Sequence, residues 1–195
     1  MQEEMRISLK ANATLDEIRE RLLNLGFYVQ EEFQLNDIYM IDKKEEISLE
    51  NFENIFSNYI LIRECVGKKN SLVLRKREKN EKGETLRHTS TKCPIVSCND
   101  AYCLMKQLGY TKLLTLNVHN IVFSNDKNEI CVQNVEGLGV YIEMNQHNIK
   151  ITKNNGDTIE EMITNLTSYD LPLDTTNSRA TKSFDMLKKV IEERK

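Results

Sequence analysis

Two neighbouring segments, residues 59–63 and 72–77, set apolar side chains beside arginines at a spacing of two. This pattern limits the possible folds strongly, because successive side chains of a β-strand point to opposite faces of the sheet. It predicts two strands with one apolar face and an opposite face that carries Arg63, Arg75 and Arg77.

Such a basic face has two interpretations. It can be a solvated outer face, which is usual for an antiparallel sheet that covers the core with one side only. It can instead bind anions, because the planar guanidinium group of arginine matches the oxygens of a phosphate. The alternation of residues alone leaves both interpretations open.

The composition limits the classes of partner. The chain has 195 residues, of which 39% are hydrophobic, and a formal net charge of -3. This charge argues against general binding to nucleic acids or membranes, which needs a basic excess. No apolar run approaches the roughly 18 residues of a transmembrane helix, and the first residues lack a signal-peptide pattern. The five cysteines include no Cys-x-x-Cys pair, so we expect reduced thiols in a cytoplasmic protein.

Periodicity and turn signals predict an α+β chain. Thr14 and Glu17 form a capping box at the start of one helix, which ends at Gly26. A second capped helix begins after Ser97 and ends at Gly109. The remaining predicted helices lie near 48–56, 157–168 and 179–193. The predicted strands lie near 4–10, 27–41 (as one strand or two), 59–66, 71–78, 85–92, 112–123, 129–134 and 140–145.

A short internal repeat suggests two related halves. Leu25-Gly26-Phe27 and Leu108-Gly109-Tyr110 both end a helix that precedes a long strand. Chance is the competing explanation, because Leu-Gly-aromatic is a common helix ending. We expect one domain over 1–195, with halves of about 1–92 and 93–150 and C-terminal helices within 157–193.

Several motifs carry a resemblance to the CYTH superfamily of triphosphate-binding proteins. The residues that match its motifs are Glu4-Met5-Arg6-Ile7-Ser8, Asp37-Ile38-Tyr39, Leu61-Ile62-Arg63, Val73-Leu74-Arg75, Gly137 to Asn145, and Ser183-Phe184. The order of strands and helices also resembles that of the superfamily over nearly the whole chain. The superfamily includes class IV adenylyl cyclases, thiamine triphosphatases and other triphosphatases.

The resemblance implies an eight-stranded antiparallel β-barrel, a tunnel for a triphosphate with flanking helices. Basic residues would then point inward and bind phosphate, which implies this role for Arg6, Arg63, Arg75 and Arg77. Carboxylates would hold Mg²⁺ or Mn²⁺, which implies this role for Glu4 and Glu143. A tunnel lined by unpaired arginines needs an anion, carboxylates or water, since each unpaired buried charge costs several kcal/mol.

The chain departs from the superfamily pattern at the metal-binding positions. Arg6 stands where the superfamily has a second Glu, and Ser8 stands in place of a Lys. Gln133 and Asn145 replace two further carboxylates. Magnesium depends on carboxylate ligands for charge, so these replacements weaken the expected metal site and leave Glu4 and Glu143 as its ligands.

Three functions are compatible with these residues. The first is a divalent-metal-dependent phosphohydrolase or class IV-type adenylyl cyclase. The second is a catalytically inactive module that binds a nucleotide, thiamine triphosphate, polyphosphate or another organic anion. The third is an interaction scaffold whose charges pair internally. The sequence assigns no catalytic residue. His119 is a candidate general base or ligand, although a lone strand histidine is usually structural. The substrate and the oligomeric state stay open.

Overall fold

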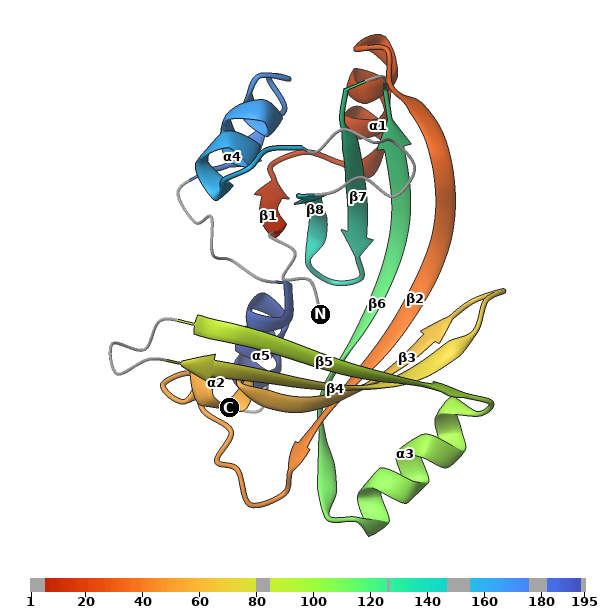
Figure 1. The fold of residues 1–195 in the computed structure, drawn as a ribbon, viewed down its shortest axis with the longest axis vertical. Helices are drawn as coiled ribbons and strands as arrows, with labels where there is room; N and C mark the ends of the chain where they lie inside the picture. Colours follow the sequence, from red (N-terminus) through yellow and green to blue (C-terminus); the bar gives the residue numbers. More distant parts are fainter. Residues whose placement is uncertain (1–5, 80–84, 126, 147–154, 176–181, 194–195) are drawn as a thin grey trace. The chain divides into compact units, whose positions relative to one another are not determined.

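The computed structural model describes residues 6–79, 85–125, 127–146, 155–175 and 182–193 (Figure 1). The helices are α1 (Leu15–Asn24), α2 (Phe52–Ile55), α3 (Cys98–Gln107), α4 (Ile159–Thr167) and α5 (Lys182–Glu192). The strands are β1 (Arg6–Ala11), β2 (Tyr28–Asp42), β3 (Asn58–Cys65), β4 (Asn70–Lys79), β5 (Thr85–Ile95), β6 (Tyr110–Ser124), β7 (Glu129–Val135), β8 (Gly139–Asn145) and β9 (Leu173–Asp174). In this part of the chain, no helix is both long and apolar enough to cross a membrane.

The strands confirm the predicted α+β class and the antiparallel sheet. Their order is β5-β4-β3-β2-β6-β7-β8-β1-β9, and antiparallel registers join β2 to β3, β3 to β4, β4 to β5, β6 to β7, β7 to β8, and β1 to both β8 and β9. The predicted closed eight-stranded barrel is not confirmed. The described residues form nine strands in a linear order, and β5 and β9 are its two edges. The extra strand is β9, whose two residues carry too little periodicity to be recognised.

The chain divides into two compact units. Unit 1 comprises Met1–Phe33 and Val118–Lys182, and unit 2 comprises Gln34–Asn117 and Ser183–Lys195. Strands β2 and β6 each continue from one unit into the other. This division cuts the chain at other points than the predicted halves do, and the single-domain organisation stays a prediction.

Unit 1 builds its core on one face of its strands. Ile7 and Leu9 of β1 are buried with Ile142 of β8, while the intervening residues are more exposed, as the alternation predicted. Helix α1 packs against β7 and α4 against β1. The capping box of Thr14 and Glu17 is confirmed, with both reciprocal hydrogen bonds present.

The end of α1 is also as predicted. Gly26 has φ +83°, a left-handed conformation that glycine adopts without strain. Its amide donates to the carbonyl of Leu23, and the amide of Phe27 donates to the carbonyl of Leu22. These two bonds form a Schellman motif, which satisfies carbonyls that the helix leaves open.

Unit 2 has a second core, between its sheet and α3. Ile60 and Ile62 of β3 pack with Ala101 and Met105 of α3, and Leu72 and Leu74 border this cluster. Figure 1 shows α3 beside β3 and β4. The opposite face of β3 and β4 is mixed: it carries Arg63 and Arg75 together with the buried apolar pair Leu61 and Val73.

Some predicted boundaries shift. The helix predicted over 48–56 is the shorter α2, because Ser48 and Asn51 form hydrogen-bonded turns before it. Strand β5 extends three residues beyond the prediction, to Ile95, and pairs with β4 along its length. Region 27–41 forms one continuous strand, β2.

Candidate anion-binding site

The predicted sidedness of the arginines in unit 2 is confirmed. Register pairs Arg63 with Ser71 and Tyr59 with Arg75 across β3 and β4. Directly paired residues of an antiparallel sheet project to the same side. The four side chains therefore share the face opposite the α3 core. We call Tyr59, Arg63, Ser71 and Arg75 the arginine face.

Arg63 already has an anionic partner within the protein. Its Nε donates to Oδ1 of Asp37 at 2.8 Å, and its Nη2 donates to Oδ2 at 2.6 Å. Asp37 is 1% exposed. This two-point geometry is the strong form of a carboxylate–guanidinium pair. Asp37, which the sequence placed in an Asp-x-Tyr motif, thus neutralises Arg63 and fixes its orientation.

Arg75 is in a different situation. Its Nε atom is buried and, in the part of the chain that the structure describes, has no hydrogen-bond partner. The hydroxyl of Ser71, four residues before Arg75 on the same face of β4, is also buried and has no hydrogen-bond partner among the described residues. A buried donor without a partner costs about 1–3 kcal/mol. The arginine face therefore holds two polar groups that an anion could satisfy.

Aromatic side chains border Arg75. The rings of Tyr39 and Tyr59 stack with centroids 5.3 Å apart, and Phe56 meets both rings edge-on. Burial, Tyr59 and Asp37 raise the pKa of Tyr39 well above its ordinary value, while Arg63 and Arg75 act in the opposite direction. Tyr39 therefore stays a neutral phenol at physiological pH.

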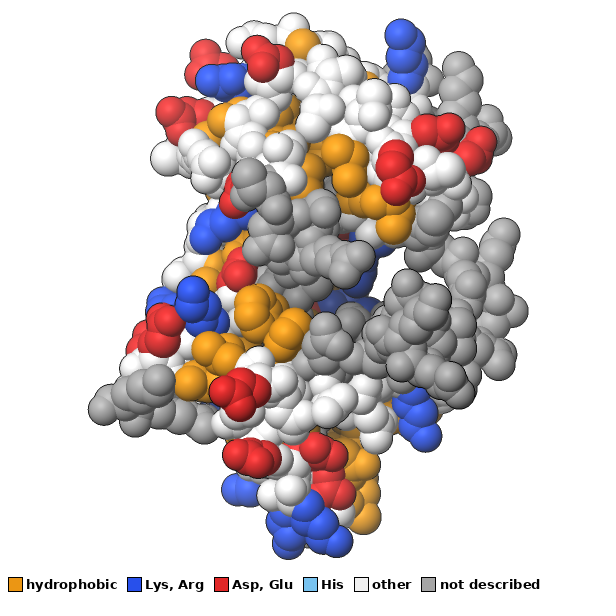
Figure 2. Space-filling view, turned by 90° about the vertical axis from the view of Figure 1, so that its left-hand side faces the viewer, with side chains coloured by type: hydrophobic (Ala, Val, Ile, Leu, Met, Phe, Trp, Pro, Cys, Tyr) orange, Lys and Arg blue, Asp and Glu red, His pale blue; other side chains and the backbone are white. Residues whose placement is uncertain are grey.

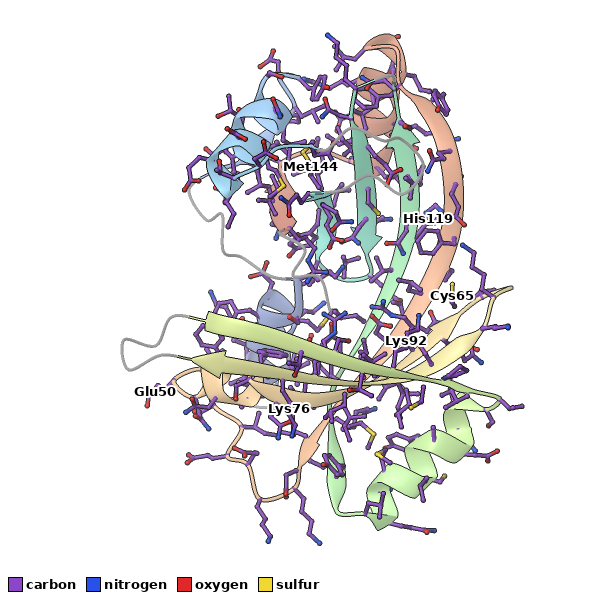
Figure 3. All side chains as sticks on the ribbon, in the orientation of Figure 1. Glu50, Cys65, Lys76, Lys92, His119 and Met144 are labelled. Carbon is purple, nitrogen blue, oxygen red and sulfur yellow. The ribbon has the colours of Figure 1, made fainter. Side chains whose placement is uncertain are left out.

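Two residues of this region were missed by sequence reasoning. Ser71 is one of them. The other is Lys92 of β5, which pairs with Val73 and is exposed (Figure 3). Arg75 pairs with Ser90, so Lys92 projects to the side of Arg75 while Lys76, the next residue of β4, projects to the other. Only the register between β4 and β5 could have identified Lys92, because residues 85–92 show no apolar alternation that fixes a face.

Two predicted site residues cannot be placed. Glu4 lies outside the described residues. The backbone of Arg77 belongs to β4 and pairs with His88, but its side chain lies outside the described part. Their roles stay predictions.

The remaining predicted residues, Arg6 and Glu143, meet in unit 1. Nη1 of Arg6 lies 3.7 Å from Oε2 of Glu143, and Nζ of Lys182 lies 3.8 Å from the same oxygen. Glu143 pairs with Ser8 on one side and with Cys131 on the other. Of the predicted site residues, Arg6 and Glu143 therefore lie next to each other in unit 1. Arg63 and Arg75 lie on the neighbouring strands β3 and β4 of unit 2.

A chain of buried amides holds Lys182. Its Nζ donates to Oε1 of Gln133 at 2.7 Å, and Nε2 of Gln133 donates to Oδ1 of Asn120 at 3.1 Å. Asn120 in turn donates to the carbonyl of Val118. Burial, followed by the charge of Glu143, raises the pKa of the adjacent Cys131 thiol to about 12. This thiol is therefore protonated and unreactive at neutral pH.

The described surroundings of Glu143 are poor in ligands for Mg²⁺ or Mn²⁺. Among the described residues, no group of three or more His, Cys, Asp and Glu is placed to hold a metal ion. At 4 Å and an effective dielectric constant of about 20, one ammonium repels a divalent ion by roughly 8 kcal/mol. A carboxylate oxygen that binds the ion directly, at about 2.1 Å, attracts it more strongly, so Lys182 and Arg6 weaken the attraction of Glu143 for a divalent ion without cancelling it. The prediction of a metal stays untested, and we derive no step through one.

His119 lies in a third setting, on β6 (Figure 3). Its Nε2 lies 2.7 Å from Oε1 of Glu32, and about a third of its side chain is exposed. We interpret this exposed pair as a cross-strand contact between polar side chains with a structural role.

Lysines and arginines are interspersed with carboxylates on the face of the molecule that Figure 2 shows. The basic character is therefore local, as the net charge required.

Comparison with known proteins supports the fold. No protein-family model matches the sequence, and no curated protein matches it. Many solved structures are similar in fold, and three of them serve as examples. The PH1819 protein of Pyrococcus horikoshii OT3 is 20% identical, with 96% of this chain and 99% of that chain covered and a TM-score of 0.66. A candidate adenylate cyclase of Vibrio parahaemolyticus is 13% identical, with 96% and 98% covered and a TM-score of 0.60. A chain of the Schizosaccharomyces pombe Mediator head module is 6% identical, with 87% and 96% covered and a TM-score of 0.51.

These likenesses concern the fold alone, because the identities are low. They show that the fold of this chain is similar to that of the candidate adenylate cyclase. The Mediator chain shows that similar folds occur in proteins of different kinds. Function must therefore be argued from the residues of this chain.

Proposed function

We propose that this CYTH-like protein binds a phosphorylated organic anion, a triphosphate such as a nucleotide or thiamine triphosphate or a polyphosphate, through the arginine face of unit 2. The observation that carries the proposal is the buried Nε of Arg75, which has no hydrogen-bond partner among the described residues. A phosphate oxygen would give this donor a partner. The Ser71 hydroxyl, roughly 13 Å further along the strand by its spacing of four residues, would bond a different phosphate of an extended ligand.

The neighbouring residues suit such a ligand. Arg63 is fixed by Asp37, so it lends orientation to the face more than net charge. Arg75 and Lys92 supply the positive charge. The stacked Tyr39 and Tyr59 rings border Arg75 with apolar surface, which excludes water and strengthens a charged contact.

The second candidate is turnover of the bound triphosphate, by hydrolysis or by cyclisation of ATP. The observation in its favour is the similarity in fold to the candidate adenylate cyclase. Phosphoryl transfer needs mainly positioning and charge neutralisation, which the arginine face could supply in part. Chromatography of ATP, incubated with the protein with and without Mg²⁺ or Mn²⁺, separates cyclic AMP from ADP and tests this candidate directly.

Calorimetric titration of the full chain with inorganic tripolyphosphate tests binding. We expect saturable binding by the natural chain and a loss of about tenfold to a hundredfold in affinity for Arg75→Gln, the value of one charge-assisted hydrogen bond. Lys76→Gln is the matched control, because it removes the same charge one residue away, at an exposed position on the other face. It should change the affinity by less than about threefold.

Two results would contradict the proposal. One is a natural chain that gives no heat of binding and no thermal stabilisation with tripolyphosphate. The other is equal loss of affinity in Arg75→Gln and Lys76→Gln, which would indicate attraction by general charge. Circular dichroism and the melting temperature of each variant separate loss of binding from loss of folding.

A further inference from the structure

Among the described residues, the carboxylate of Glu143 has two cationic neighbours, which come from distant parts of the chain. Arg6 comes from β1 and Lys182 from the start of α5, and both nitrogens lie within 4 Å of the same oxygen, Oε2. The side chain of Glu143 is 12% exposed and that of Lys182 is 18% exposed, so solvent screens their charges only partly.

These distances leave little room for a divalent ion. A Mg²⁺ ion bound to Oε2 at about 2.1 Å would lie within about 6 Å of both cationic nitrogens. It would also compete with Lys182 for the amide oxygen of Gln133, which the ammonium already holds at 2.7 Å. Gln133 cannot turn this oxygen away easily, because its other amide atom is bound to Asn120.

We propose that the ammonium of Lys182 occupies the position of a divalent cation at Glu143, so that the chain itself neutralises this carboxylate and excludes Mg²⁺ and Mn²⁺. Two sequence features agree with this role. Position 133 carries a neutral amide, which accepts a hydrogen bond from an ammonium but adds no charge to attract a metal. Position 6 carries a second cation, which further disfavours a metal. The proposal concerns unit 1 and does not depend on anion binding by unit 2.

The proposal assigns Lys182 a specific electrostatic function. A lysine that merely packs at the start of a helix could be replaced by methionine without changing metal affinity. A lysine that substitutes for a cation cannot, because its removal takes away the less exposed of the two described cations near Glu143. The other, Arg6 at 3.7 Å, is more open to solvent. The variant Lys182→Met keeps the length and apolar stem of the side chain and removes only the charge.

Titration of the full chain with MnCl₂, followed by the electron paramagnetic resonance signal of free Mn²⁺, tests the proposal. The natural chain should bind no Mn²⁺ in a manner that depends on Glu143, so Glu143→Gln should leave its titration unchanged. Lys182→Met should bind Mn²⁺ at least about tenfold more tightly. The double variant Lys182→Met/Glu143→Gln should lose this gain. Lys188→Met, an exposed lysine on the same helix, is the matched control and should behave as the natural chain.

Each outcome decides the proposal. It is overturned if the natural chain binds Mn²⁺ and Glu143→Gln abolishes the binding. It is also overturned if Lys182→Met folds but gains no Mn²⁺ affinity, or gains only as much as Lys188→Met. The comparison of the natural chain with Glu143→Gln stands on its own if Lys182→Met fails to fold, and circular dichroism reports that failure. Titration of the same proteins with tripolyphosphate tests anion binding by unit 2 separately, so failure of one proposal can be told from failure of the other.

Discussion

Two arginines on one face of unit 2 differ in what surrounds them. Arg63 is paired with Asp37 by two hydrogen bonds, and Asp37 is almost fully buried. Arg75 has a buried Nε without a partner among the described residues. Two paired charges hold each other in a fixed geometry. A buried donor without a partner lowers the free energy of unfolding, and a ligand that accepts its hydrogen bond would raise it again. This difference is the reason why we propose ligand binding for Arg75, while Arg63 supports the structure through Asp37.

Removal of Asp37 should destabilise the protein strongly. Asp37→Ala leaves the partly buried guanidinium of Arg63 without its carboxylate, which costs about 3 kcal/mol in the free energy of unfolding. Urea denaturation measures this loss. The double variant Asp37→Leu/Arg63→Met should recover most of it, because it replaces both charges by apolar groups.

The same two strands provide a control. Asn36 and Glu64 are also directly paired, with a hydrogen bond of 2.7 Å, but at an exposed position on the other face of the sheet, beyond the α3 core. Asn36→Ala should cost less than about 1 kcal/mol. If Asp37→Ala and Asn36→Ala lowered the free energy of unfolding equally, burial of the Asp37–Arg63 pair would add nothing to stability.

At the scale of elements, a buried asparagine holds the segment before α4 against the sheet of unit 1. Asn155 is 1% exposed. Its Nδ2 donates to the carbonyls of Glu129 and Asn145, and its Oδ1 accepts from the amide of Glu129 and from the side chain of Asn128. One side chain thus joins the ends of β7 and β8 to the segment that leads into α4.

Replacement of Asn155 should therefore loosen α4. Asn155→Ala leaves several buried groups unsatisfied and should lower the free energy of unfolding by about 3–5 kcal/mol. Hydrogen exchange measured by mass spectrometry should show faster exchange in α4 than in α3. Asn165→Ala, which removes a single bond to the carbonyl of Asn155, is the control with a loss of about 1 kcal/mol. Unchanged exchange in α4 would show that other contacts hold this helix.

At the scale of the whole molecule, two cores are linked by two long strands. The first core contains Leu9 and Ile142, and the second contains Ile62 and Met105. Strands β2 and β6 have 15 residues each and belong to both units. If one unit unfolds, parts of these strands lose their partners, so we expect the two units to unfold together.

Leu9→Ala tests this cooperativity. The cavity should cost about 2–5 kcal/mol, and the loss should appear in both units. Hydrogen exchange of β7 and β3, followed through a urea titration, should shift to lower urea by the same amount. Leu23→Ala removes a side chain that is 47% exposed and should shift neither strand noticeably. A shift of β7 with none in β3 would show that the units unfold separately.

Local sequence patterns predicted the elements well where one pattern dominates. The alternation of β1, the capping box of α1 and its glycine ending depend on residues within a few positions of each other, so they can be recognised without a tertiary structure. The opposite sides of Ile62 and Arg63 follow from the same local rule. Strand β9 and the start of α2 could not be predicted, because two residues show no period and because side-chain turns compete with a helix.

The sequence by itself determined the α+β class, the order of most strands along the chain, and the face of their strands on which Arg63 and Arg75 lie. All of these follow from the spacing of residues along the chain. Only the tertiary structure decided the partners of the charged residues: Asp37 for Arg63, Lys182 and Arg6 for Glu143, and no described hydrogen-bond partner for the buried Nε of Arg75. These pairs join residues far apart in sequence. Their energies depend on distance, burial and local dielectric, which strand register sets and spacing along the chain does not.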